Sequence, residues 1–213
     1  VIQRMDKQNV IIDLGKVEAV LTVNEQIPGE IYQCHDRMKT YILEVKRTSK
    51  GTQVMVSRTH PGLLKRLFEL EVPEISDGVV EIKSVAREPG MRSKISVYTQ
   101  DENIDPVGAC VGHKGMRVQT IVNELRGEKI DIVKYSEDPA QYVANALSPA
   151  KVVSTEVNMD EKICRVVVPD YQLSLAIGKE GQNARLAAKL TGWKIDIKSE
   201  SQAAEEAYAE GEE

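Results

Sequence analysis

The stretch Val111-Gly112-His113-Lys114-Gly115 decides the fold, because it occurs a second time as Ile177-Gly178-Lys179-Glu180-Gly181. In both copies an apolar residue precedes Gly-x-x-Gly, and a helix-compatible run follows. Each copy then ends on the same four residues, Lys-Ile-Asp-Ile, at 129–132 and at 194–197. The two motifs lie 66 residues apart, so the repeated unit is a small domain and not a short solenoid repeat.

A single Gly-x-x-Gly is weak evidence, since glycine is common in turns, and two ordinary turns between helices are the alternative interpretation. The context favours a duplicated domain. The apolar residues after the first motif recur at the spacing of one helix face: Val118, Ile121, Val122 and Leu125. The corresponding residues after the second motif are Ala184, Ala187, Ala188 and, after a one-residue deletion, Leu190.

The composition bounds the class of protein without identifying a ligand. A chain of 213 residues holds one or two average domains, or three small ones. Its net charge is −5, but residues 199–213 contain six glutamates and no Lys or Arg, which leaves residues 1–198 nearly neutral. Total charge therefore gives no support for a nucleic-acid binder, although a local basic stripe would suffice. The low aromatic content, 4%, limits base stacking.

No catalytic or metal-binding constellation is recognisable. The three cysteines, Cys34, Cys110 and Cys164, are far apart, which argues against zinc and a disulfide framework and favours reduced, buried thiols in a cytoplasmic protein. The three histidines are scattered, so we expect no enzyme, no cofactor and no metal. Nothing resembles a signal peptide or a membrane span. The chain starts at Val1 within a β-rich pattern, and we expect a piece of a longer protein.

Residues 1–60 predict a small all-β barrel of the OB type. Short alternating runs separated by turns indicate about five strands, and closing such a sheet removes exposed edges. The runs are Val10–Gly15, Lys16–Leu21, a start at Ile31, Tyr41–Val45 and Gln53–Ser57. Basic and aromatic side chains on the outer face form a moderate candidate platform for single-stranded nucleic acid, although each alone is more often a solvated charge: Arg4, Lys7, Arg37, Lys39, Tyr41 and Lys46.

Residues 61–136 and 137–198 each predict the order α-β-β-α-α-β, and residues 199–213 predict an acidic, disordered tail. Helices open at Asp105-Pro106 and Asp138-Pro139, where Asp suits the N-cap and Pro the first turn. The predicted elements of the first unit are a helix before Pro73, strands 78–87 and 92–98, helices ending at Gly112 and spanning 116–126, and strand 129–134. Those of the second are helix 138–146, strands 151–157 and 162–168, helices 169–177 and 182–190, and strand 193–198.

Two helices joined by Gly-x-x-Gly suit a sugar-phosphate backbone. The second helix presents free N–H groups and partial positive charge at its N-terminus, and glycine lets the backbone approach closely. A KH domain clamps about four nucleotides with such a loop beside an apolar groove. Lys114 and Lys179 suit a phosphate, whereas Glu180 weakens the second loop. The candidate RNA-binding residues are Val111, Gly112, His113, Lys114, Gly115, Arg117, Ile177, Gly178, Lys179, Glu180, Gly181, Gln182 and Arg185. For Val111 and Ile177, core packing is the competing role.

Four passages spread over residues 60–197 carry a family resemblance: HPGLLKRLFELEVPEI, REPGMRSKISVY, DPVGACVGHKGMRVQTIVNEL and LAIGKEGQNARLAAKLTGWKIDI. An S1-like barrel followed by two type II KH domains resembles the RNA-binding part of the bacterial NusA family of transcription factors. The resemblance implies binding of nascent single-stranded RNA and control of RNA polymerase pausing, termination and antitermination. The first barrel strand is cut short, and the family's polymerase-binding N-terminal domain is not in this sequence.

Two other functions remain open at this point. One is the RNA-targeting module of an RNA-processing or degrading enzyme whose catalytic domain is elsewhere; polynucleotide phosphorylase joins the same module types in the opposite order. The other is a protein-binding scaffold with inert KH units, which Glu180 and the near-neutral charge favour. We expect a monomer, because three small domains with short linkers can pack together.

Overall fold

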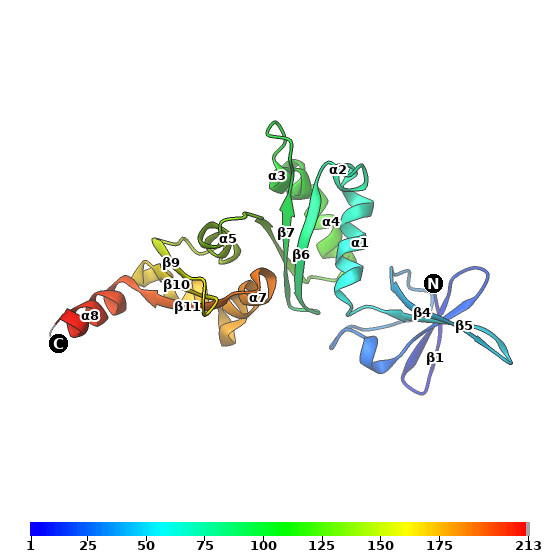
Figure 1. The fold of residues 1–213 in the computed structure, drawn as a ribbon. Coiled ribbons are helices and arrows are strands. Elements are labelled where there is room, and N and C mark those ends of the chain that lie inside the picture. The colour runs from blue at the N-terminus through cyan, green and yellow to red at the C-terminus, as the bar shows by residue number, and fades with distance from the viewer. Residues whose placement is uncertain (212–213) are drawn as a thin grey trace.

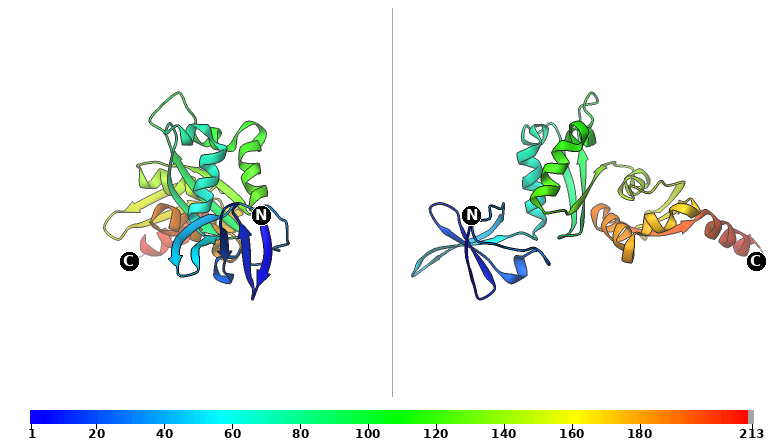
Figure 2. Two further views of the ribbon diagram at one scale, coloured as in Figure 1. Left: turned by 90° about the vertical axis from the view of Figure 1, so that its right-hand side faces the viewer. Right: turned by 180° about the vertical axis from the view of Figure 1, so that it is seen from behind.

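The computed structural model describes residues 1–211 and places them in three units arranged in a row (Figure 1). A β-rich unit at the N-terminus is followed by two α/β units, and a last helix extends from the far end. The view from behind keeps this order, with the chain termini toward opposite ends of the molecule, whereas the units overlap in the view turned by 90° (Figure 2). Among residues 1–211, the helices are all too short or too polar to cross a membrane.

The N-terminal unit is a five-stranded sheet in the order β1-β2-β3-β5-β4, with β3 and β5 parallel. This is the strand order of an OB barrel, as predicted. Val10 and Ile12 on β2 fill its interior with other alternate apolar residues. A register shift follows Ile2, and β1 forms no ladder with β4 within the described residues. The strands are β1 Ile2–Asp6, β2 Asn9–Asp13, β3 Glu18–Leu21, β4 Tyr41–Thr48 and β5 Gly51–Ser57.

The segment between β3 and β4 differs from the prediction. Ile31 begins no strand in the described chain, and its side chain is 69% exposed. The reason is that this segment packs back onto the barrel through side chains: Tyr32 and Met38 contact the barrel core, and the Tyr32 hydroxyl accepts the N–H of Ile27 at 3.1 Å. A single 3₁₀ turn, Val23–Glu25, precedes it.

The first α/β unit has the predicted order, with a short extra helix after Val72. Helix α1 begins where His60 Nδ1 accepts the N–H of Gly62 at 2.9 Å and Pro61 takes the first helical position. The sheet order is β6-β7-β8, and β8 is parallel to β7 because two helices connect them. The elements are α1 Pro61–Glu71, α2 Pro73–Ser76, β6 Glu81–Glu88, β7 Arg92–Tyr98, α3 Pro106–Val111, α4 Met116–Glu124 and β8 Lys129–Lys134.

The second α/β unit repeats this plan, so the type II KH order is confirmed for both. Asp138 caps its first helix by accepting the N–H of Ala140 at 3.1 Å, and Gly192 ends α7 in the left-handed conformation. The sheet order is β11-β10-β9, with β10 and β11 parallel. The elements are α5 Pro139–Ala146, β9 Ser154–Asn158, β10 Ile163–Val168, α6 Leu173–Ile177, α7 Gln182–Thr191 and β11 Lys194–Ser199.

A buried arginine joins the barrel to the first KH unit. Arg58, at the end of β5, is fully buried and donates to the Glu30 carboxylate through Nε and Nη2, at 3.0 Å each. It also donates to the carboxylate of Glu124 at 3.1 Å and to the backbone carbonyl of Glu124 at 3.0 Å. Within the first KH unit, the buried carboxylate of Glu128 accepts hydrogen bonds from Arg87, which also donates to the carbonyl of His60 at 3.0 Å. The junction is therefore a charge-compensated interface.

The two KH units share a core. The helices of the first unit cover one face of its sheet, and α5 and α7 of the second unit lie against the other. Ala86 and Val133 of that face belong to the hydrophobic core of the second unit. Lys94 Nζ, on the same face and fully buried, donates to Asp131 at 2.9 Å and to the carbonyl of Ser148 at 2.8 Å. Neither unit buries this surface alone.

The ion pairs of Asp131 with Arg92 and Lys94 predict that the stability of this junction falls at acidic pH. Burial alone would raise the pKa of the Asp131 carboxyl, but hydrogen bonds from Arg92 and Lys94 outweigh burial and hold the pKa below its usual range. A carboxyl with a depressed folded pKa stabilises the fold above its unfolded pKa, about 3.9, and loses that contribution as the pH falls through the folded pKa. Urea denaturation from pH 7 downward should therefore show Asp131→Asn less stable than wild type at neutral pH, with the difference shrinking below about pH 4. A difference that stays constant with pH would contradict this.

The C-terminal segment is the main departure from the sequence prediction. Instead of a disordered tail, residues 200–211 form helix α8, Glu200–Gly211, while residues 212–213 lie outside the described part of the chain. A capping box starts the helix: Ser199 Oγ accepts the N–H of Gln202 at 3.2 Å, and Gln202 Oε1 accepts the N–H of Ser199 at 3.0 Å. An ion pair between Lys198 and Glu206 then ties α8 to β11.

Candidate nucleic-acid interface

The two glycine loops have nearly the same backbone conformation. Gly112 and Gly178 have φ/ψ of 78/174° and 79/168°. Lys114 and Glu180, the third residues, both occupy the left-handed region, at 52/29° and 55/27°. The closing glycines, Gly115 and Gly181, have 73/15° and 75/12°. The duplication therefore extends from the sequence to the geometry of the loop.

The two glycines of each motif have different roles. A Cβ on Gly112 would lie 2.6 Å from Arg117 Cγ, and one on Gly178 would lie 2.7 Å from the backbone N of Asn183. For Gly115, by contrast, no atom of the described residues other than those of Gly115 and its two chain neighbours lies within 4 Å of such a Cβ. The first glycine is needed for packing of the two helices, whereas the second faces open space where a ligand backbone can approach.

Each loop leads into an uncapped helix. Helices α4 and α7 begin at Met116 and Gln182, and in the described structure no side chain caps either N-terminus. The N–H of Met116 donates to the carbonyl of His113 in the preceding turn, and that of Gln182 donates to the carbonyl of Lys179. Among the described residues no side chain caps the N–H groups that follow, so an anion can approach them, and the helix dipole also favours it. Such a site fits a phosphate group.

The side chains between the glycines point away from the core, as the sequence predicts. His113, Lys114, Lys179 and Glu180 are exposed. The first loop thus offers a lysine and a histidine, and the second pairs a lysine with a carboxylate. The apolar residues that precede the loops differ slightly in solvent exposure, since Val111 is half-buried and Ile177 is 37% exposed.

Arg117 and Asn183 are equivalent positions of the two copies, because they are separated by the repeat spacing of 66 residues. Arg117 Nη1 donates to the carbonyl of Ala109 at 2.7 Å and to Glu74 at 2.9 Å. Asn183 Nδ2 donates to the carbonyl of Ala176 at 2.9 Å. Both side chains tie the helix before the loop to the helix after it. RNA contact by Arg117 stays a prediction, and its guanidinium is already engaged within the unit.

Arg185, another candidate near the second loop, lies at the junction with the first unit. Arg185 donates to the carbonyl of Glu180 at 3.0 Å and to Glu88 of β6 at 2.6 Å. The Nε2 of Gln182 is buried and has no hydrogen-bond partner within the described residues. The second loop is therefore held against the first KH unit, a contact that sequence reasoning missed because Glu88 and Arg185 are 97 residues apart.

The barrel face offers less than the sequence suggests. Tyr41 stacks on His60 with ring centroids 4.5 Å apart and packs against the core of the first KH unit. Arg4 and Lys46 form exposed ion pairs with Glu18 and Glu44. Part of the predicted platform is thus already occupied by neighbouring side chains.

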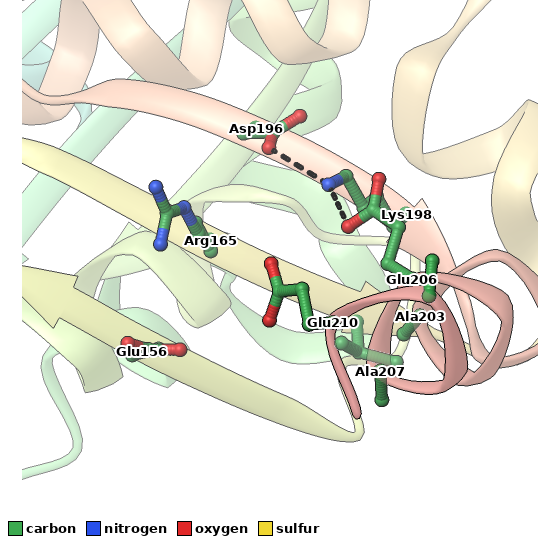
Figure 3. A pocket seen from close by; sticks show the side chains of 10 residues that line it. Glu156, Arg165, Asp196, Lys198, Ala203, Glu206, Ala207 and Glu210 are labelled. Carbon is green, nitrogen blue, oxygen red and sulfur yellow. Dashed lines mark hydrogen bonds and ion pairs between the residues drawn. The ribbon is translucent and has the colours of Figure 1, made fainter. Parts of the chain in front are cut away.

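A cavity of about 650 Å³ lies between α8 and the sheet of the second KH unit (Figure 3). Arg165 and Lys198 point into it, and so do four carboxylates, from Glu156, Asp196, Glu206 and Glu210. Excess negative charge makes this cavity unsuitable for an RNA backbone. By strand register, Arg165 and Asp196 correspond to the buried Lys94 and the partly buried Asp131 of the first unit.

Family models match the two KH units separately. A model described as NusA-like first KH domain matches residues 58–135, and one described as NusA-like second KH domain matches residues 139–205.

Curated relatives carry the name transcription termination/antitermination protein NusA. That of Halalkalibacterium halodurans is 69% identical over 212 residues, which is 100% of this chain and 56% of the relative. That of Bacillus subtilis is 68% identical over 205 residues, 96% of this chain and 55% of the relative. That of Thermus thermophilus is 50% identical over 196 residues, which is 92% of this chain and 51% of the relative. The chain thus spans about half the length of these relatives.

Among solved structures, one named "Crystal structure of APE1850" is 25% identical and covers 63% of this chain and 96% of its own, with a TM-score of 0.45. A similarity this loose adds nothing to the family assignment.

Proposed function

The chain belongs to the NusA family, and from this membership we propose that it holds single-stranded nascent RNA for a transcription elongation factor that regulates RNA polymerase pausing, termination and antitermination. The carrying observation is the pair of Gly-x-x-Gly loops with matching backbone geometry, each opening an uncapped helix. Phosphates bind at these two helix N-termini, and the side chains of Lys114 and Lys179 add charge.

The other parts of the proposal follow from the family. The segment acts by binding and not by catalysis, it works in the cytoplasm as a monomer, and RNA polymerase is the partner of the full-length protein. Two packed junctions support a single extended RNA-binding surface, because Arg58 fixes the barrel and Lys94 fixes the second KH unit to the first.

The test places a negative charge where the phosphate lies. Gly115 and Gly181 have left-handed backbones that Asp and Asn tolerate, and both have open space at the Cβ position. The double variant Gly115→Asp, Gly181→Asp should lose about 1 kcal/mol per loop through charge repulsion across solvent, or about thirtyfold in affinity for single-stranded RNA. Fluorescence anisotropy with a labelled oligonucleotide measures the loss.

The neutral double variant Gly115→Asn, Gly181→Asn is the matched control, since it adds the same volume without the charge and should bind nearly as wild type. The affinity should also fall with salt, with a logarithmic slope of about −0.7 for each neutralised phosphate. Because the second loop carries Glu180, Gly115→Asp alone should cost more than Gly181→Asp alone. Equal affinity of wild type and the double Asp variant would refute phosphate binding at these loops.

A further inference from the structure

A second cavity lies at the corner of the first KH unit where β7 and β8 end and α3 begins. Its volume is about 310 Å³. Tyr98 closes β7, Tyr135 follows β8 directly, and Pro106 begins α3, so three elements meet here. Lys134, exposed, lies at the end of β8, and Asp101 and Glu102 come from the loop before α3. We call this cavity, together with the residues that line it, the tyrosine corner.

The aromatic side chains of the tyrosine corner form a cluster that remains partly open. The Tyr98 and Tyr135 rings meet edge to face with centroids 5.8 Å apart, and both residues are only half-buried. Tyr135 also meets the buried Tyr142 of the second unit at 4.9 Å, which holds it in place. Lys83 Nζ lies 5.0 Å from the Tyr98 centroid and 5.3 Å from that of Tyr135. A fixed aromatic surface of this kind suits a planar, apolar ring.

The charges select which part of a nucleotide fits. Asp101 and Glu102 line the cavity, and their carboxylates repel a phosphate. The same oxygens accept hydrogen bonds from an amino group. A base that carries an exocyclic amine therefore fits the interior, and its phosphate remains outside on the side of Lys134.

The tyrosine corner lies within reach of an RNA held by the first loop. Helix α3 runs from Pro106 at the corner to Val111 at the loop, six residues or about 9 Å, and it packs against β8. Four nucleotides at the stacked spacing of about 3.4 Å already cover a longer distance. A strand that follows α3 away from Gly112 therefore arrives at this cavity.

The second KH unit has no such corner. The register pairs Val97 with Lys134 in the first unit and Val168 with Ser199 in the second, so Pro169 and Glu200 stand where Tyr98 and Tyr135 do. Asp170 and Ser201 fill that region with hydrogen bonds to each other. The aromatic pair is specific to the copy that adjoins a following KH unit.

We propose that the tyrosine corner is a subsite for one base of single-stranded RNA, preferably a base with an exocyclic amino group, on the path between the two KH units. This inference rests on the proposed RNA-binding function. The probes are oligoadenylate and oligouridylate of equal length, long enough to span the first loop and the corner, because adenine has the amine and uracil lacks it.

Tyr98→Leu keeps an apolar side chain and removes the aromatic face. Since stacking of a base contributes about 1–3 kcal/mol, the affinity for oligoadenylate should fall about 5- to 150-fold, and Tyr98→Phe should restore it. The loss should be the same at low and high salt, because no phosphate contact is removed. Glu102→Gln should narrow the preference for oligoadenylate over oligouridylate.

Two results separate this subsite from the function as a whole. Wild-type affinity of Tyr98→Leu, together with weak binding by the Gly115→Asp, Gly181→Asp variant, would overturn the subsite and leave RNA binding intact. Wild-type affinity of the double Asp variant would overturn the function itself. If Tyr98→Leu unfolds, photocrosslinking of wild type to a halogenated oligonucleotide decides: crosslinks to peptides containing Tyr98 or Tyr135 support the subsite, and crosslinks confined to the loops overturn it.

Discussion

Arg58→Met is expected to lower the free energy of unfolding by about 3–5 kcal/mol, the usual cost of breaking a buried ion pair on one side. The substitution leaves the Glu30 carboxylate, whose side chain is 2% exposed, without its cation. It also removes the donors to the backbone carbonyls of Lys39 and Glu124. Methionine fills much of the same volume, so the loss reports charge and hydrogen bonding more than a cavity. Urea denaturation followed by circular dichroism measures it.

Two further variants make this result specific. Arg66→Met removes an arginine from an exposed ion pair with Glu69 and should leave stability almost unchanged. The double variant Arg58→Met, Glu30→Gln removes both members of the buried pair and should recover part of the loss, since no buried charge is then uncompensated. If Arg58→Met unfolds at the wild-type urea concentration, the junction does not depend on this network.

Gly178→Ala is expected to destabilise the second KH unit by roughly 2–5 kcal/mol, because two costs combine. The backbone at φ 79° and ψ 168° lies in a region that only glycine occupies readily. The new Cβ would also lie 2.7 Å from the backbone N and 2.8 Å from the Cβ of Asn183, which α7 holds in place. Trp193, the single tryptophan, packs against the core of this unit, so its fluorescence follows the unfolding.

Gly181→Ala in the same loop is the matched control. Its backbone is left-handed as well, but apart from the adjoining residues a new Cβ would meet only Arg185 Nη1 at 3.9 Å among the described residues, the end of a flexible side chain. The expected cost is about 1–2 kcal/mol from the backbone alone. Equal losses for the two variants would show that the first glycine has no special packing role.

The order of elements was predictable because it depends on local patterns. Apolar periodicity and Asp-Pro pairs place the helices, and the repeated glycines align the two copies before any contact is known. Helix α8 is not predicted from the sequence, because the acidic composition of residues 199–213 favours disorder and the capping box of Ser199 and Gln202 is a weaker local signal. Cys34 is exposed, whereas Cys110 and Cys164 are buried as expected.

The junctions could not be predicted from the sequence, since a charged residue is normally a surface residue. Nothing local distinguishes the buried Arg58 and Lys94 from solvated neighbours. Their burial depends on Glu124 and Ser148, which are 66 and 54 residues away and come from other units. The same holds for the tyrosine corner, where Tyr98 and Tyr135 become neighbours only once β7 and β8 pair in parallel.

The charged residues on the sheet face beneath α8 disfavour the docking of a further KH unit on the second one. In the first KH unit, Ala86 and Val133 let a second unit dock on the sheet, and the register places Glu156 and Lys198 at the same points of the second. A third copy docking there would have to dehydrate both charges, at several kcal/mol for each ion. Docking of a third copy on this face is therefore unfavourable, and α8, joined by the Lys198–Glu206 pair, already lies against it.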